Sequence, residues 1–131
     1  MSTENLTIPI AVCGLHMRGF ALEKQMQGHG AVFLREAATA PRYRMVKLPT
    51  VPAKPGLIKL PSGGGSIQLE VWEMPLARLG SFTAGIPSPL GIGKIELYDG
   101  TEVVGFICEG YAAELPGAED VTESGGWRNV V

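Results

Sequence analysis

Glycine and proline interrupt this chain so often that only short elements fit between them. The 131 residues include 18 glycines and 10 prolines. Such frequent interruption favours many short elements joined by defined turns, and it argues against a helical bundle. The chain is long enough to bury a core without disulfides or a metal. We therefore expect residues 1–131 to form one β-rich α+β domain.

The apolar runs between these breaks predict the individual elements of the first half. Strands are expected over residues 8–13, 31–35, 43–48 and 67–74, where the pattern is short and apolar or alternating. Helices are expected over residues 22–27 and 76–82, and Pro75 suits the first position of the second one. Either face of the strand at residues 67–74 could be the inner one. Residues 49–65 are expected to be irregular, around a short apolar run.

The second half contains the clearest hairpin. Residues 94–98 and 102–108 are joined through Asp99-Gly100, the pair preferred in type I′ turns. Before the hairpin, residues 85–93 hold three glycines and two prolines and are expected to form a stiff, shaped loop. Residues 117–128 predict a short acidic helix, with Trp127 anchoring the end of the chain on the core.

Charge and cysteine content exclude several classes of function. The net charge is −2 and no basic cluster occurs, so binding to nucleic acid or to an anionic membrane is not expected. No apolar run has the length of a membrane span, and the polar start lacks the pattern of a signal peptide, which makes the cytoplasm the expected location. Cys13 and Cys108 lie in apolar runs, as buried free thiols do. The two cysteines and two histidines do not have the spacing of a zinc site.

One segment brings titratable chemistry to the end of a strand. The apolar run that ends at Gly14 is followed by His16 and Arg18, and then by the expected helix. A glycine loop before a helix can bind an anion, Arg18 offers a planar fork for a carboxylate, and His16 titrates near neutrality. The alternative is that His16 packs at the strand end while Arg18 is solvated. Cys13 is disfavoured as a nucleophile because a thiol inside the strand points into the core.

Short segments spread along nearly the whole chain form an ordered set of motifs. They are residues 12–19 (VCGLHMRG), 33–36 (FLRE), 39–41 (TAP) with Tyr43, 55–57 (PGL), 71–73 (VWE), 80–82 (GSF), 85–87 (GIP), 89–93 (PLGIG), 99–100, 105–106 and 125–128 (GGWR). Together these segments resemble the C-terminal domain of allophanate hydrolase. The resemblance implies a γ-glutamylcyclotransferase-like fold, which is a compact mixed β-sheet or barrel with a few short helices. It also implies a pocket beside the glycine loop for a small carboxylate or ureido ligand.

In that family the domain accompanies an amidase and is associated with decarboxylation of N-carboxycarbamate. The resemblance implies that His16 is the catalytic residue and that no metal or organic cofactor is needed. The expected substrate-binding residues are Gly14, Leu15, Met17, Arg18, Tyr43, Ser81, Phe82, Pro87, Leu90 and Gly91. The sequence contains no amidase segment, so a separate amidase is an expected partner, as is a second copy of the chain in a homodimer.

Two other functions remain open at this point. The chain could be a non-catalytic ligand-binding or assembly module for an amidase. It could also catalyse a γ-glutamylcyclotransferase-like reaction, but residues 79–85 lack the carboxylate that cyclotransferases use, and Glu73 is the nearest substitute. Three further charged residues could enter the pocket or cover the surface, namely Arg35, Arg44 and Glu109.

Overall fold

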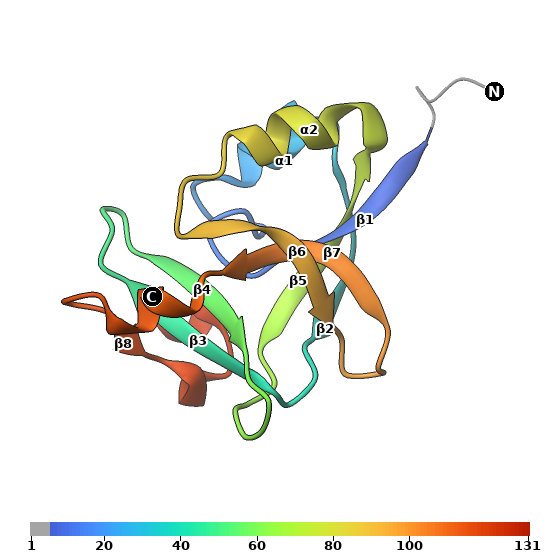
Figure 1. Cartoon of the computed structure of the whole chain (residues 1–131). Coiled ribbons are helices and arrows are strands. Elements are labelled where there is room, and N and C mark those ends of the chain that lie inside the picture. The colour runs from blue at the N-terminus through green and yellow to red at the C-terminus, as the bar shows by residue number, and fades with distance from the viewer. Residues whose placement is uncertain (1–5) are drawn as a thin grey trace.

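A five-stranded sheet with the order β2-β5-β1-β7-β6 forms the centre of the computed structural model, which describes residues 6–131 (Figure 1). The strands are β1 (Thr7–Val12), β2 (Val32–Ala38), β3 (Tyr43–Leu48), β4 (Lys54–Lys59), β5 (Gln68–Pro75), β6 (Leu90–Glu96), β7 (Glu102–Cys108) and β8 (Glu119–Asp120). The helices are α1 (Glu23–Gly28) and α2 (Leu76–Ala84), with 3-10 turns η2 (Gly110–Glu114), η3 (Thr122–Ser124) and η4 (Trp127–Asn129). The first five residues of the polar start lie outside the described part of the chain.

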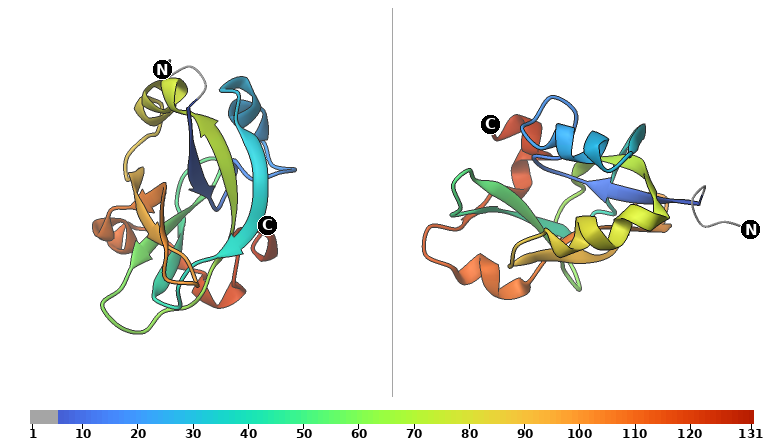
Figure 2. Two further views of the ribbon diagram at one scale, coloured as in Figure 1. Left: turned by 90° about the vertical axis from the view of Figure 1, so that its right-hand side faces the viewer. Right: turned by 90° about the horizontal axis from the view of Figure 1, so that it is seen from above.

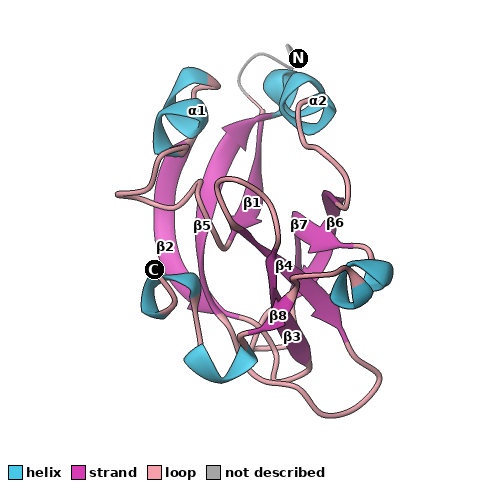
Figure 3. Ribbon diagram, turned by 90° about the vertical axis from the view of Figure 1, so that its left-hand side faces the viewer, coloured by secondary structure: helices cyan, strands magenta, loops and turns pink. Residues whose placement is uncertain are grey.

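The sheet is mixed, and this confirms the α+β expectation. Strand β1 pairs antiparallel with β5 and parallel with β7. Strands β4, β3 and β8 form a second, smaller sheet (Figure 3). Among residues 6–131 the outer strands β2 and β6 do not pair with each other, so the sheets form no closed barrel. No helix in this range has the length and apolar character needed to cross a membrane.

Both faces of β5 are buried, with Trp72 and Met74 in one core cluster and Leu69 and Val71 in another, so both faces of this strand are inner ones. The second half of β1 is buried in the same way. Ile10 and Val12 of β1 join one core cluster, while Ala11 joins another that includes Met45 and Leu57 of the small sheet. The first cluster also takes in Met26 of α1 and Phe82 of α2. Figure 2 shows these two helices at the same end of the molecule. A strand covered on both faces has to be almost continuously apolar, as residues 8–13 are.

Two strands differ from the expectation because glycine or proline lies inside them. Residues 54–59 form β4 rather than an irregular stretch, and Pro55 is tolerated there because β4 is an edge strand. Strand β6 begins at Leu90, four residues before the predicted start. A side chain at Gly93 would crowd Ile107, because its Cβ would lie 2.5 Å from Ile107 Cδ1.

One turn, the C-terminal segment and the junction between β5 and α2 also differ from the expectation. No described residue other than glycine has a positive φ, so the turn at Asp99-Gly100 is not type I′. The hairpin closes instead through the Leu97 N–H, which donates to the Thr101 carbonyl at 2.8 Å. Residues 117–128 form β8 and 3-10 turns rather than an α-helix, because Glu119 and Asp120 pair with β3 and Gly125, at a φ of +76°, ends η3. Pro75 ends β5 and caps α2 instead of starting it. Trp127 is buried, as expected.

One buried carboxylate ties the loop after β1 to the end of the chain. Glu70 of β5 is only 2% exposed. Its Oε1 accepts hydrogen bonds from the backbone N–H of Arg18 at 2.9 Å and from Trp72 Nε1 at 3.0 Å. Its Oε2 accepts from Arg18 Nε at 3.1 Å and from Arg128 Nη2 at 2.9 Å. We call Glu70, Arg18, Trp72 and Arg128 the Glu70 cluster.

Replacing Glu70 tests how much the cluster stabilises the fold. Burial tends to raise the pKa of Glu70, but the hydrogen bonds outweigh it and hold the pKa below its ordinary value of 4.5. A lowered pKa contributes stability that is fully present above about pH 4.5 and is lost as the pH falls through the lowered pKa. At pH 7, Glu70→Gln should reduce the free energy of unfolding by ~2–4 kcal/mol, measured by urea denaturation, and the difference should shrink in acid.

The matched control is Glu36→Gln. Glu36 binds Nη2 of the same arginine, but its side chain is 75% exposed. This change should therefore reduce the free energy of unfolding by less than ~0.5 kcal/mol. Equal losses in the two variants would contradict the role assigned to burial of Glu70.

Candidate functional site

The loop between β1 and α1 forms one wall of a cavity, and its shape is set by backbone contacts. Met17 N–H donates to the Gly14 carbonyl at 3.0 Å, and Leu22 N–H donates to the Leu15 carbonyl at 2.9 Å. A Cβ on Gly14 would lie 2.6 Å from the ring of Pro55, so only glycine lets the loop approach β4 this closely. Gly19 has a φ of +87°, which a residue with a side chain rarely adopts.

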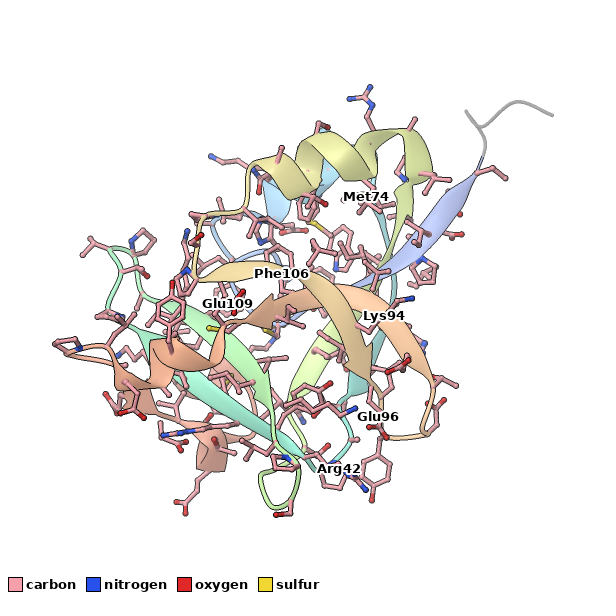
Figure 4. The ribbon with its side chains drawn as sticks, in the orientation of Figure 1. Arg42, Met74, Lys94, Glu96, Phe106 and Glu109 are labelled. Carbon is pink, nitrogen blue, oxygen red and sulfur yellow. The ribbon has the colours of Figure 1, made fainter. Side chains whose placement is uncertain are left out.

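The cavity has a volume of about 270 Å³, close to the lower end of the ~300–1,000 Å³ that small-molecule sites span. Gly14, Leu15 and His16 of the loop line it together with Gln25 of α1. The opposite walls are apolar and come from the end of α2, the segment before β6, and β7; they include Phe82, Ile86, Pro87, Leu90 and Phe106. Figure 4 labels Phe106 on β7.

His16 is held at this cavity by two aromatic rings and one hydrogen bond. Its ring centroid lies 5.4 Å from that of Phe82 and 5.0 Å from that of Phe106. Its Nε2 is hydrogen-bonded to Oε1 of Gln25. Burial lowers the pKa of His16 below its ordinary value of 6.5, the Gln25 bond opposes this shift, and the charges of Lys54 and His29 add to it. The imidazole is therefore mostly neutral at neutral pH.

The charge at the cavity comes from Lys54, the first residue of β4. Its side chain is half-buried, and among residues 6–131 no carboxylate lies within ion-pair distance of it. No Asp or Glu is among the described residues that line the cavity. Cys13 also lines it, but burial and the neighbouring Cys108 raise the pKa of the Cys13 thiol to about 12. The cavity therefore suits a small anion and offers no nucleophilic thiolate.

The structure brings together six of the site residues expected from the sequence. These are Gly14, Leu15, His16, Phe82, Pro87 and Leu90, all of which line the cavity.

Five expected residues lie elsewhere. Arg18 faces away from the cavity, because its guanidinium stacks 3.6 Å over the Phe33 ring and pairs with Glu36 and Glu70. Met17 is buried in the core. Tyr43 lies between the two sheets, where its hydroxyl accepts the Glu96 N–H at 2.9 Å.

The other two lie on the elements that flank the cavity. The Ser81 hydroxyl donates to the Arg78 carbonyl on the exposed face of α2, at 3.1 Å. Gly91 is in β6 and pairs with Ile107, and only its neighbour Leu90 reaches the cavity.

The charged residues left open by the sequence also lie outside the cavity lining. Glu73 accepts a hydrogen bond from the Thr7 hydroxyl. Arg44 pairs with Asp120 at 2.9 Å. Arg35 is exposed on β2, and Glu109, labelled in Figure 4, is exposed just after β7.

Sequence reasoning missed Lys54, Gln25 and Phe106. Lys54 directly precedes the Pro55-Gly56-Leu57 segment, and this position could have indicated it. It was missed because residues 49–65 were expected to be irregular, whereas Lys54 begins strand β4. Gln25 and Phe106 lie in a helix and a strand that the sequence predicts, but no local pattern shows that these two residues face a cavity. Within residues 6–131 no three His, Cys, Asp or Glu side chains are grouped to hold a metal.

Comparison with known proteins shows the family to which this chain belongs. Residues 8–131 match the family model for the allophanate hydrolase C-terminal domain. A urea amidolyase from Lachancea kluyveri is 38% identical over 128 residues, which is 95% of this chain but 7% of that protein. The urea amidolyase of Saccharomyces cerevisiae is 37% identical and is likewise covered over 7% of its length. The chain thus spans a small part of these relatives.

Solved structures agree with the sequence match. The chain superimposes on Kluyveromyces lactis allophanate hydrolase with a TM-score of 0.91 at 40% identity, covering 95% of this chain and 21% of that one. A uropathogenic E. coli-specific protein gives a TM-score of 0.88 at 38% identity, with 95% of both chains covered. An aig2-like protein from Mus musculus, at 22% identity over 84% of each chain and a TM-score of 0.62, supports the γ-glutamylcyclotransferase-like fold. The chain therefore belongs to the family of allophanate hydrolase C-terminal domains.

Proposed function

We propose that this protein binds a small carboxylated urea derivative in the His16 cavity and promotes its decarboxylation, with N-carboxycarbamate or a related compound as substrate. The observation that carries the proposal is the meeting of a titratable imidazole, His16, and a lysine side chain, Lys54, in a cavity whose described lining has no carboxylate. The membership of the chain in the allophanate hydrolase C-terminal domain family supports a role in urea or allophanate metabolism. A cytoplasmic location belongs to the same proposal.

The reaction needs one proton for each molecule of carbon dioxide released. When R–NH–CO₂⁻ loses carbon dioxide, the N–C bond breaks and its electron pair goes to nitrogen, which takes up a proton to give R–NH₂. His16 is the group in the cavity that exchanges protons near neutral pH. Lys54 holds the carboxylate, and the apolar rings of Phe82 and Phe106 exclude water around it. Arg18, expected for the carboxylate, is engaged in the Glu70 cluster.

A cyclotransferase reaction is the weaker alternative because it requires a carboxylate at the site. A non-catalytic module bound to an amidase is the other alternative, and it is favoured by the relatives in which the matched segment is a small part of a longer chain. A separate amidase as partner remains a proposal, and so does a homodimer.

Replacing His16 tests the catalytic proposal. With N-carboxycarbamate generated by an added amidase, His16→Ala should lower the rate constant for carbon dioxide release by ~100-fold or more at pH 6, since general acid–base groups contribute ~10²–10⁴-fold. Because the active imidazolium forms as the pH falls through a pKa below 6.5, the wild-type rate should rise from pH 8 downward and level off below that pKa.

The matched control is His29→Gln. His29 packs on the same Phe82 ring but does not line the cavity. Removing its charge should raise the pKa of His16 slightly, so the rate of this variant should equal or slightly exceed the wild-type rate and should not fall. Equal rates for the wild type and the folded His16→Ala variant would overturn the catalytic proposal and favour the non-catalytic module.

Replacing Lys54 tests the anion-binding role. Lys54→Met should raise KM by ~10–100-fold, since a hydrogen bond to a charged group contributes ~1.5–3 kcal/mol, and Lys54→Arg should restore part of the binding. Lys59→Met, a change at the exposed end of the same strand, should leave KM unchanged. An unchanged KM in Lys54→Met would assign carboxylate binding to other groups.

A further inference from the structure

The two histidines of the chain lie near one another, and each is hydrogen-bonded to a different part of Gln25. His16 Nε2 meets the side-chain Oε1 of Gln25. His29 Nδ1 lies 2.9 Å from the backbone oxygen of Gln25. Both rings pack on Phe82, with centroid distances of 5.4 Å for His16 and 5.3 Å for His29.

These acceptors decide where each imidazole carries its proton. A carboxamide oxygen and a peptide oxygen only accept hydrogen bonds, so the nitrogen that faces each of them has to be the N–H. His16 is therefore protonated on Nε2 and His29 on Nδ1. Among residues 6–131, nothing donates a hydrogen bond to the remaining Nδ1 of His16.

Gln25 itself is firmly placed on α1. Its N–H donates to the Leu22 carbonyl at 3.0 Å, and Leu22 N–H donates back to Leu15, the residue before His16. The next residue, Met26, is fully buried in the core. The helix therefore fixes the distance between the carboxamide and the loop that carries the imidazole.

We infer that Gln25 is a positioning residue whose carboxamide oxygen keeps the proton of His16 on Nε2, so that Nδ1 is the atom that exchanges a proton with a ligand in the cavity. The tautomer stands on the hydrogen bond alone, whereas the role of Nδ1 in catalysis rests on the proposed function.

The neutral charge of Gln25 is part of this role. The charged or titratable groups facing His16 are Lys54 from β4 and His29 after α1, and Cys13 beside them stays protonated. A carboxylate at position 25 would orient the ring equally well but would stabilise the imidazolium. The carboxamide orients the ring without adding a negative charge to a cavity that we propose holds an anion.

Nuclear magnetic resonance of the whole chain labelled with ¹⁵N-histidine tests the tautomer directly. In the wild type at pH 8, long-range ¹H–¹⁵N spectra should show His16 protonated on Nε2 and His29 on Nδ1, with His29→Gln used for assignment. Gln25→Leu should shift His16 toward a mixture of tautomers, and Gln25→Glu should raise the pKa of His16 by about one unit. His29 is the internal control, because side-chain variants keep its backbone acceptor.

The outcomes separate this inference from the proposed function. Protonation of His16 on Nδ1 in the wild type, or an unchanged tautomer in Gln25→Leu, would overturn the inference. A raised KM in Gln25→Leu with an unchanged tautomer would also overturn the inference, because it would show that Gln25 binds the ligand. In Gln25→Glu, the midpoint of the pH profile for carbon dioxide release should move up together with the pKa of His16. If the tautomers are as expected but neither the wild type nor any variant accelerates carbon dioxide release, the proposed function fails, whereas the role of Gln25 in positioning His16 stands.

Discussion

The buried carboxylate of Glu70 is the interaction on which the arrangement of the site depends. It joins three segments that are far apart in the sequence: the loop after β1 through Arg18, strand β5 through Trp72, and the C-terminal turn through Arg128. An ionised carboxylate with 2% exposure is tolerated only when its lone pairs are filled. The loop that carries His16 is therefore anchored on one side by Glu70 and approaches Pro55 on the other.

This anchoring gives the loop two faces with different chemistry. Arg18 is neutralised by Glu70 and Glu36 on one face, while His16 lies at the cavity on the other. The positive charge that a ligand in the cavity can reach is then that of Lys54, which lies on β4 of the second sheet. A lysine side chain and an imidazole that can take up and release a proton, with no carboxylate in the described lining, suit a small anion that needs a proton. This electrostatic balance is why we favour decarboxylation over cyclotransfer.

Much of the fold could be predicted because its strands are short and their burial is local in origin. The run at residues 8–13 is apolar since both faces of β1 are covered, and β3 was predicted with the bounds that the structure has. The two strands whose extent was mispredicted share one cause. Pro55 and Gly93 look like breakers of regular structure, yet an edge position and a close neighbour, Ile107, make them suitable residues for β4 and β6.

By itself the sequence determined the class of the fold and the approximate position of most strands, and it placed His16 in the loop after the first strand, because spacing and residue type act over a few neighbours along the chain. Only the tertiary structure decided which charged groups share the site. It turned Arg18 toward a carboxylate 52 residues away and brought Lys54 to the cavity. The guanidinium groups of Arg18 and Arg128 reach the buried carboxylate of Glu70 because distant segments of the chain pack together. No pattern of neighbouring residues in the sequence predicts that contact.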